Sequence, residues 1–199
     1  MSNNLPESYR QAIKSRTAWH YLKGWLIRGW TNCKYAISRS VARRNGATIG
    51  EAVALPLSLA RMANKNLVVG SHVCIQTDKL DVRNPVHIGN YVIIGADVEI
   101  LTTSHDIDSP QFVTKHYGIT IEDYTWISGK VLILPSCRHI GLGAVVSAGS
   151  VVVRNVEAMS VVGGNPAQEF KHRENMHTEL VVESLLGGDF DAYREARKG

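Results

Sequence analysis

The sequence predicts a mainly β protein built as a parallel β-helix, and two observations support this fold class. An aliphatic residue, usually followed by Gly or another small residue, recurs every six positions through the middle of the chain. Gly and Asn, which tolerate the left-handed backbone of a tight corner, follow many of these positions. A short fixed period indicates a repeat architecture, and a period of six indicates a parallel β-helix.

The repeat runs in two blocks after a weak beginning near Gly46. Its aliphatic positions are Val69, Ile75, Ile88, Ile94, Ile100, Ile121, Ile127, Ile133, Ile140, Val146 and Val152. We expect these side chains to point inward and to stack coil upon coil, so that hydrophobic burial stabilises the stack. Three sides of six residues predict a coil of about 18 residues.

The repeat is interrupted in three places. Residues 76–87 break its phase, and the step from Ile133 to Ile140 holds seven residues rather than six. Each of these irregularities predicts a bulge or a small loop. The longest interruption, residues 106–117, begins directly after His105 and predicts a loop extruded from the β-helix.

Residues 1–46 predict a basic helical arm. They carry nine Lys and Arg against Glu7 alone, a net charge of +8, whereas the remaining residues carry −4 and the whole chain +4. Pro6 suits the first turn of a helix, where its missing N–H would go unpaired in any case. Farther along, Gly24 and Gly29 leave open whether the helix is continuous.

One face of this predicted helix carries large apolar residues at helical spacing: Trp19, Leu22, Leu26 and Trp30. Two kinds of partner stay open for it. The face packs on its own domain or a neighbouring subunit, or it contacts an anionic membrane, because basic residues interleaved with Trp suit a lipid surface. Nucleic acid is not expected as a partner, since no nucleic-acid-binding motif accompanies the charge.

The segment after the repeat predicts helices. Residues 168–185 predict a helix that Gly187 and Gly188 end, and residues 191–198 predict a short second helix. The expected organisation is therefore a helical arm over residues 1–46, a β-helix over residues 47–167 with the extruded loop 106–117, and a helical tail over residues 168–199.

Cysteine usage and the first residues indicate a compartment. Three widely spaced cysteines, Cys33, Cys74 and Cys137, do not form a disulfide framework, which favours a reducing environment. The first residues lack the layout of a signal peptide, and no apolar stretch is long enough for a spanning helix. We therefore expect a cytoplasmic protein, either free or peripheral at the inner face of the membrane.

Four stretches of the chain carry a family resemblance. They are I-E-D-Y-T-W-I at residues 121–127, I-L-P at 133–135, I-G-L-G-A-V-V-S-A-G-S-V-V-V-R-N-V at 140–156 and V-V-G-G-N-P-A at 161–167. Together they closely resemble the hexapeptide-repeat acetyltransferases. More narrowly, they resemble the maltose and galactoside O-acetyltransferases and the colanic-acid-type acetyltransferases of polysaccharide biosynthesis. The resemblance covers residues 69–173.

This resemblance implies a left-handed parallel β-helix that assembles as a homotrimer, with active sites between subunits and the extruded loop covering the acceptor. It implies transfer of an acetyl group from acetyl-CoA, a co-substrate, to a hydroxyl of a sugar or glycan in polysaccharide biosynthesis. Some members instead acetylate the amine of an amino sugar or a small molecule. A few keep the repeat as a non-catalytic scaffold, and these alternatives stay open.

His105 matches the catalytic histidine of the family, and the chemistry asks for such a residue. A sugar hydroxyl is a poor nucleophile at neutral pH, and an imidazole with a pKa of about 6.5 can accept its proton during attack on the thioester. The same proton then passes to the leaving CoA thiolate, so we expect direct transfer. Asp106, Asp108 or a backbone carbonyl are the candidates to hold the second ring nitrogen, and both carboxylates are also candidate substrate ligands.

Two further groups are weighed as ligands. Asp97 matches a position where sugar acetyltransferases often carry an acceptor-binding Asn, and its carboxylate suits either sugar hydroxyls or an amine; a solvated corner residue is the other interpretation. The pairs His72 with Cys74 and Cys137 with His139 each place two ligand types close together in sequence. They lack a recognisable four-ligand spacing, so no metal site is expected.

For acetyl-CoA, the resemblance implies a site on the late coils. Its residues are Trp126, Gly129, Ala148, Arg154, Lys171 and Arg173. The small residues let backbone and ligand approach closely, and the basic residues suit the phosphates of CoA through charge-assisted hydrogen bonds. Val153 and Gln168 depart from the family pattern, so two alternatives stay open: the phosphate contacts are fewer, or they fall to Lys171 and Arg173.

Overall fold

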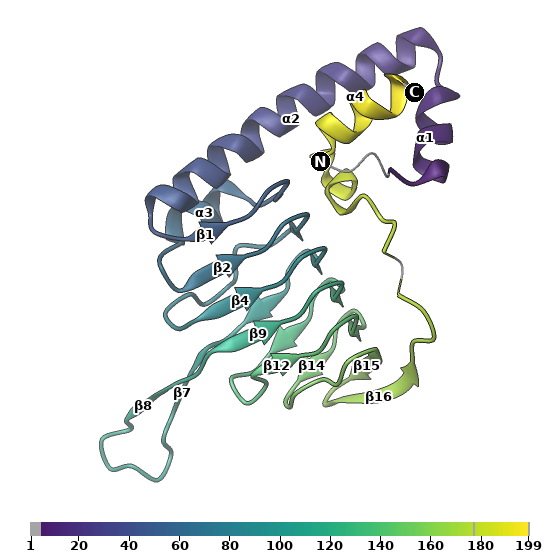
Figure 1. Ribbon diagram of the computed structural model, residues 1–199. Helices are drawn as coiled ribbons and strands as arrows, with labels where there is room; N and C mark the ends of the chain where they lie inside the picture. Colours follow the sequence, from purple (N-terminus) through teal and green to yellow (C-terminus); the bar gives the residue numbers. More distant parts are fainter. Residues whose placement is uncertain (1–4, 177, 199) are drawn as a thin grey trace.

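The computed structural model describes residues 5–176 and 178–198. It consists of a stack of β coils with helices at one end and a two-stranded hairpin that projects from the stack (Figure 1). The first four residues of the predicted arm, and His177 and Gly199 of the predicted tail, lie outside the described residues. No described helix combines the length with the apolar character that crossing a lipid bilayer requires.

Short strands form three sheets along the stack. The first sheet holds β1 (Thr48–Ile49), β2 (Leu67–Val69), β4 (Val86–Ile88), β9 (Ile119–Ile121) and β12 (His139–Ile140). The second holds β3 (Cys74–Ile75), β5 (Ile93–Ile94), β10 (Trp126–Ile127), β13 (Val145–Val146), β15 (Ser160–Gly164) and β16 (Ala167–His172). The third holds β6 (Glu99–Ile100), β11 (Leu132–Ile133) and β14 (Val151–Val152). Neighbouring strands are parallel, apart from the antiparallel pair β15–β16.

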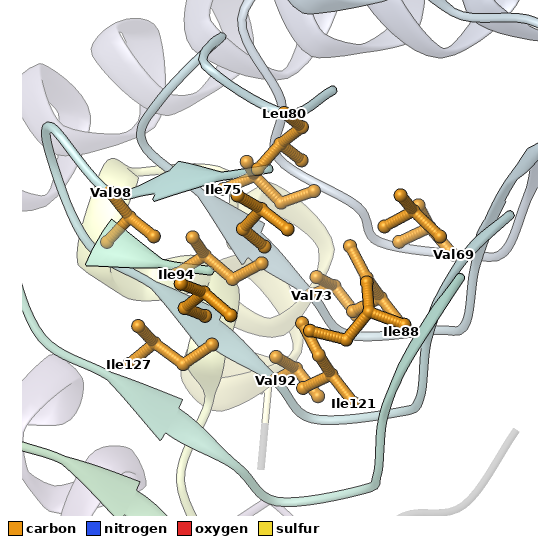
Figure 2. Packing of buried hydrophobic residues seen from close by; sticks show 14 of the residues in the cluster. Val69, Val73, Ile75, Leu80, Ile88, Val92, Ile94, Val98, Ile121 and Ile127 are labelled. Carbon is orange, nitrogen blue, oxygen red and sulfur yellow. The ribbon is translucent and has the colours of Figure 1, made fainter. Parts of the chain in front are cut away.

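The aliphatic side chains of the repeat fill the interior of the stack, as predicted. Figure 2 shows Val69, Ile88 and Ile121 of the first sheet and Ile94 and Ile127 of the second lining the same interior from two sides. All the repeat positions named above are buried, with at most 3% of their surface exposed. Because each coil lays the same position on the coil before it, one six-residue pattern builds a continuous apolar core.

Two of the coils are one residue longer than the 18 residues that a strict period of six predicts. Ile121 pairs with Ile140, which lies 19 positions later, and the same spacing separates the paired residues of β2 and β4. In the later of these coils the extra residue lies between Ile133 and Ile140. There the Cys137 N–H donates to the Leu134 carbonyl at 2.9 Å and closes a turn. The seven-residue step is therefore a turn that lengthens one corner.

The sequence predicted that the glycine after each inward aliphatic residue supplies the left-handed backbone of a corner, but most of these glycines have a different role. The left-handed backbone occurs three residues after the inward aliphatic residue, for example at Tyr91 (φ 56°) and Lys130 (φ 59°). The glycine that directly follows the aliphatic residue serves another purpose. At Gly89, an added Cβ would lie 2.8 Å from the backbone nitrogen of Asp123 in the next coil. Glycine is needed there because the coils approach closely, and not because of its dihedral freedom.

The long interruption of the repeat is an antiparallel hairpin of β7 (Thr103–His105) and β8 (Thr114–His116). It projects where the chain passes from the third sheet to the first (Figure 1). The predicted loop 106–117 is therefore the outer part of a longer excursion, and His105 lies on its first strand. The hairpin is solvated, since Ile107 near its tip is 81% exposed.

The arm and its neighbours are helical. The helices are α1 (Glu7–Lys14), α2 (Ala18–Arg44), α3 (Leu57–Met62) and α4 (Phe190–Lys198). Pro6 stands just before α1 as its N-cap, rather than within the first turn. α2 is one continuous helix of 27 residues, which ends four residues before the first strand of the stack.

The two glycines of α2 do not break the helix, because they face α4. A Cβ at Gly24 would collide with the hydroxyl of Tyr193, and one at Gly29 would lie 3.3 Å from the ring of Phe190. Tyr193 is fully buried against the arm. The glycines thus let α4 lie close on α2, which compensates for their low helix propensity.

The predicted helix over residues 168–185 is wrong. Ala167–His172 form β16, which returns along β15 in an antiparallel hairpin, and Val182–Leu186 form a short 3₁₀ helix, η1. The reason is the end of the stack: the last parallel strand has an open edge, and the chain turns back to pair with it. The second predicted helix is confirmed as α4.

Candidate active site

On the hairpin, the side chain of His105 contacts Phe112. His105 pairs with Thr114 across the hairpin, and its Nδ1 lies 3.0 Å from the carbonyl oxygen of Phe112. The ring of Phe112 also stacks on the imidazole, with ring centres 4.4 Å apart and planes 11° from parallel. Phe112 itself has a left-handed backbone with φ 50°. The same residue therefore contacts His105 with both its carbonyl and its ring.

This contact determines what the exposed imidazole can do. A carbonyl oxygen only accepts hydrogen bonds, so Nδ1 must carry the proton that bonds to Phe112. In the neutral ring, Nε2 then has the free lone pair and can accept a proton. His105 is exposed on the hairpin, so that a substrate can reach this nitrogen.

The two carboxylates near His105 are not its partners. Asp106 pairs with Lys115 at 3.1 Å and accepts a hydrogen bond from the backbone N–H of Asp108. The hydrogen bond from Lys115 holds the pKa of Asp106 below its ordinary value. Of the three candidates for orienting His105, the backbone carbonyl is the one in contact, and Asp106 instead ties the two strands of the hairpin together.

A groove of about 940 Å³ lies at the foot of the hairpin. It is lined by Leu101, Thr103, Ser104, Tyr117, Leu134, Pro135, Ser136, Arg138, Arg154 and Asn155. Arg154 donates to the side-chain oxygen of Gln168 at 2.9 Å, and the guanidinium of Arg138 lies 4.7 Å from the ring centre of Tyr117. The groove thus combines apolar walls with two cations, next to the strand that carries His105. We call this corner of the stack, between the third and first sheets, the hairpin corner.

Other predicted site residues lie at a different corner, between the second and third sheets, which we call the Asp97 corner. Asp97 has φ 57° there and pairs with Lys79 at 3.2 Å. The corners of successive coils stack on it through backbone hydrogen bonds, one of which joins the Gly149 N–H to the Gly129 carbonyl at 3.1 Å. Gly129 and Ala148 therefore share an edge of the stack with Asp97, whereas Arg154 shares the edge of His105.

The remaining predicted residues are more scattered. Trp126 lies on β10 with its side chain half exposed on the outer face of the second sheet. Lys171 is on β16 and exposed. Arg173 donates to the Gly143 carbonyl at 2.7 Å, at the third corner of the stack. One chain therefore does not bring the predicted acetyl-CoA residues together.

Sequence reasoning missed Phe112, Arg138 and Tyr117. No local motif marks them, because each becomes part of the site through contacts made across the hairpin or between coils. One signal in the sequence could have indicated Phe112: it lies towards the far end of the interruption that begins after His105. An extruded loop has to return, so a residue near its end is expected to face the residue at its start.

The comparisons with known proteins agree with this architecture. No protein-family model matches the chain. The chain is 28% identical over 179 residues to WcaF of Escherichia coli K12, a protein named as a candidate colanic acid biosynthesis acetyltransferase; the match covers 88% of this chain and 96% of that protein. It is 38% identical over 109 residues to YJL218W of Saccharomyces cerevisiae, named as a candidate acetyltransferase, covering 53% of this chain and 50% of the relative. The chain spans about half the length of the two yeast relatives that it matches.

Solved structures give the same result for the fold. The hexapeptide-repeat acetyltransferase VCA0836 of Vibrio cholerae, in complex with acetyl coenzyme A, has a TM-score of 0.55 and 24% identity, covering 85% of this chain and 92% of that chain. A galactoside acetyltransferase in complex with coenzyme A has a TM-score of 0.52 and 17% identity over the same shares of the two chains. The resemblance predicted from the motifs is confirmed: the chain is similar in sequence to proteins named as acetyltransferases, and it has the fold of the hexapeptide-repeat acetyltransferase structures.

Proposed function

We propose that the protein is an acetyl-CoA-dependent O-acetyltransferase that acetylates a sugar hydroxyl in polysaccharide or glycan biosynthesis. The E. coli relative, aligned over 96% of its length, is named for colanic acid biosynthesis. The observation that carries the proposal is the His105 ring, with Nδ1 on the Phe112 carbonyl at 3.0 Å. This contact supports a role for Nε2 as a general base for a hydroxyl.

The proposed mechanism is direct transfer. Nε2 of His105 takes the proton of the acceptor hydroxyl as its oxygen bonds to the thioester carbon, and it returns that proton to the departing thiolate of CoA. The Nδ1–H bond to Phe112 keeps the ring in the tautomer that this needs and stabilises the transient imidazolium. A backbone N–H of a coil corner is the expected donor to the developing oxyanion.

A covalent acetyl-cysteine is not part of the proposal. Burial raises the pKa of the Cys74 thiol to about 11 and that of the Cys137 thiol to about 11, so neither is a ready nucleophile at neutral pH. Cys33 lies on α2, at the helical end of the stack. The free state of these cysteines also supports the proposed cytoplasmic location.

The residues of the groove suit acetyl-CoA. Its volume of about 940 Å³ is at the upper end of ordinary ligand sites, which are about 300–1,000 Å³. Arg138 and Arg154 offer charge-assisted hydrogen bonds to phosphates, while Leu134 and Pro135 offer an apolar wall to a pantetheine arm. In this proposal Gln168 holds Arg154, which gives a physical role to its departure from the family pattern.

We further propose that three copies of a left-handed β-helix assemble so that the hairpin corner of one copy meets the Asp97 corner of the next. Such a trimer would unite His105 and Arg154 with Asp97, Gly129 and Ala148. The outer faces of the sheets support this arrangement. The outward row of the second sheet is apolar (Ile93, Trp126, Val145 and Val161), whereas that of the first sheet is more polar (Val68, His87, Thr120 and His139). Trp126 is half exposed and the other three residues of this apolar row are partly exposed, so the row is a surface that self-association would bury further.

The acceptor distinguishes two versions of the reaction. The Asp97 carboxylate is more than half exposed beside Lys79, so it is open to an amine, and this favours N-acetylation of an amino sugar as the second candidate. A non-catalytic scaffold is the third candidate, and it predicts no turnover with any acceptor.

The test is a thiol-release assay with acetyl-CoA and a panel of sugars, glycan fragments and amino sugars. Release that depends on a neutral sugar, and that a His105→Ala variant loses, is the expected result. Release only with amino sugars would replace the first candidate by the second. If the protein neither binds acetyl-CoA nor turns over any acceptor, the non-catalytic scaffold is the one remaining candidate function.

A further inference from the structure

The long helix α2 has two unlike faces. Its inward face packs on α4 and on the coil stack: Gly24 meets Tyr193, Arg28 pairs with the buried Asp189 at 2.9 Å, and Ser38 and Ala42 are buried. The steps between these residues, four, ten and four positions, are close to whole numbers of helical turns, so they form one stripe along the helix. The partners of this stripe are all accounted for within the chain.

The opposite face carries an exposed apolar stripe, which we call the tryptophan stripe. It consists of Trp19, Leu22, Leu26, Trp30 and Ile37. Trp19 is 71% exposed and Trp30 67%, and the other three are at least 49% exposed. With a rise of 1.5 Å per residue, the stripe runs for about 27 Å along the helix. Among the described residues, this face does not pack on its own domain, so a neighbouring subunit and a membrane remain of the partners that the sequence left open.

The charge around the stripe points to the class of partner. Residues 18–44 contain six Lys and Arg and no Asp or Glu. Arg28 is paired, and Arg39 and Arg43 donate to backbone carbonyls of the first coil. The two lysines, Lys23 and Lys34, lie within one helical turn of stripe residues, and the Lys34 ammonium is 5.5 Å from the ring centre of Trp30.

We propose that the tryptophan stripe docks in the surface of an anionic lipid bilayer, with α2 lying parallel to the membrane plane. Trp and Leu would enter the interfacial layer, while lysine stems extend along it and keep their ammonium groups at the lipid headgroups. A second copy of the chain fits less well, because it would bring a like-charged helix with no acidic residue against this one. The proposal is independent of the acetyl transfer proposed above.

Sedimentation with lipid vesicles tests the proposal on the full chain. We expect the protein to cosediment with vesicles that mix phosphatidylcholine and phosphatidylglycerol, weakly or not at all with phosphatidylcholine alone, and less as NaCl is raised. Trp19→Ala with Trp30→Ala should weaken binding at least tenfold. Lys23→Glu with Lys34→Glu should remove the preference for anionic vesicles, since basic residues near such a surface supply the electrostatic attraction to it.

A matched control lies at the other end of the stack, on β16 (Figure 1). Phe170, which is 66% exposed, and its neighbour Lys171 provide the same kinds of side chain, so Phe170→Ala with Lys171→Glu should leave vesicle binding unchanged. Circular dichroism checks that each variant keeps its helices, and sedimentation velocity gives its oligomeric state. Three results would overturn the proposal: no binding by the parent, equal loss in the β16 control, or stripe variants that bind vesicles normally but change oligomeric state.

Discussion

The coil stack and the β7–β8 hairpin hold their side chains in opposite ways. Inward residues of the stack, such as Ile127, are fully buried and repeat in register through several coils. On the hairpin, Ile107 and Phe112 are 81% and 56% exposed, and two short strands with the Asp106–Lys115 ion pair hold it together. The stack therefore supplies stability, and the hairpin leaves the imidazole of His105 accessible. Substitutions in the stack should therefore lower the free energy of unfolding, whereas substitutions in the hairpin should lower the catalytic rate.

The largest effect is expected at the base itself. His105→Ala should lower kcat about 10²–10⁴-fold, the usual contribution of a general base. The melting temperature should stay the same, because the side chain is exposed on the hairpin. His116→Ala is the matched control, since His116 is an exposed histidine on the partner strand. Equal activity of the His105→Ala variant and the parent would refute the mechanism.

A core substitution should reverse this pattern. Ile127→Ala is expected to lower the free energy of unfolding by about 2–5 kcal/mol, because it leaves a cavity in the close-packed interior. Activity per folded molecule should change little. Ile107→Ala at the hairpin tip should change the free energy of unfolding by less than about 0.5 kcal/mol. Urea titrations measure both variants, and similar losses for the two isoleucines would contradict the comparison.

Phe112 tests how the hairpin positions its base. Phe112→Ala keeps the carbonyl that accepts from Nδ1 and removes the stacked ring, so kcat should fall about tenfold with little change in KM. Phe112→Gly also keeps the carbonyl and suits the left-handed backbone, so it separates ring stacking from backbone strain. Val113→Ala, an exposed apolar neighbour, is the control. Nitrogen NMR shifts of His105 should show Nδ1 less uniformly protonated in the alanine variant, and an unchanged spectrum with reduced kcat would argue against positioning.

The smallest effect concerns a contact that fastens the tail to the stack. His72 lies 3.2 Å from the buried Glu183 of η1, and this hydrogen bond raises the His72 pKa, opposed by burial. Because the pKa of His72 is higher in the folded than in the unfolded protein, its protonation stabilises the fold. This stabilisation is complete at pH values below the unfolded-state pKa of about 6.5, and it is lost as the pH rises through the folded-state pKa.

His72→Gln should therefore reduce stability in acid more than at alkaline pH, as followed by thermal unfolding at several pH values. Because His72 is partly exposed, solvent screening keeps the difference small. Glu183→Gln removes the partner of His72. The stability of the double variant His72→Gln with Glu183→Gln should therefore depend on pH no less than that of His72→Gln alone. A His72→Gln effect that grows with pH would have the wrong sign for this contact.

Much of the stack could be predicted from the sequence, whereas the geometry of the candidate site could not. Ile94 and Ile127 are readable as inward residues because a six-residue period repeats the same environment in each coil. The partner of His105 is not readable, because Phe112 reaches it only once the hairpin closes. The error over residues 168–185 has a similar cause, since the strand β16 forms in response to an open sheet edge that no local pattern announces.

The sequence by itself therefore determined which residues form the core and where the coils are interrupted. Period and composition suffice for these features, because each follows from local spacing and from the burial of apolar side chains. Only the tertiary structure decided which face of α2 stays exposed, which carbonyl holds His105 and at which corners the other site residues lie. These depend on contacts between segments far apart in the chain, and their geometry is set by how the coils, hairpin and helices pack in three dimensions.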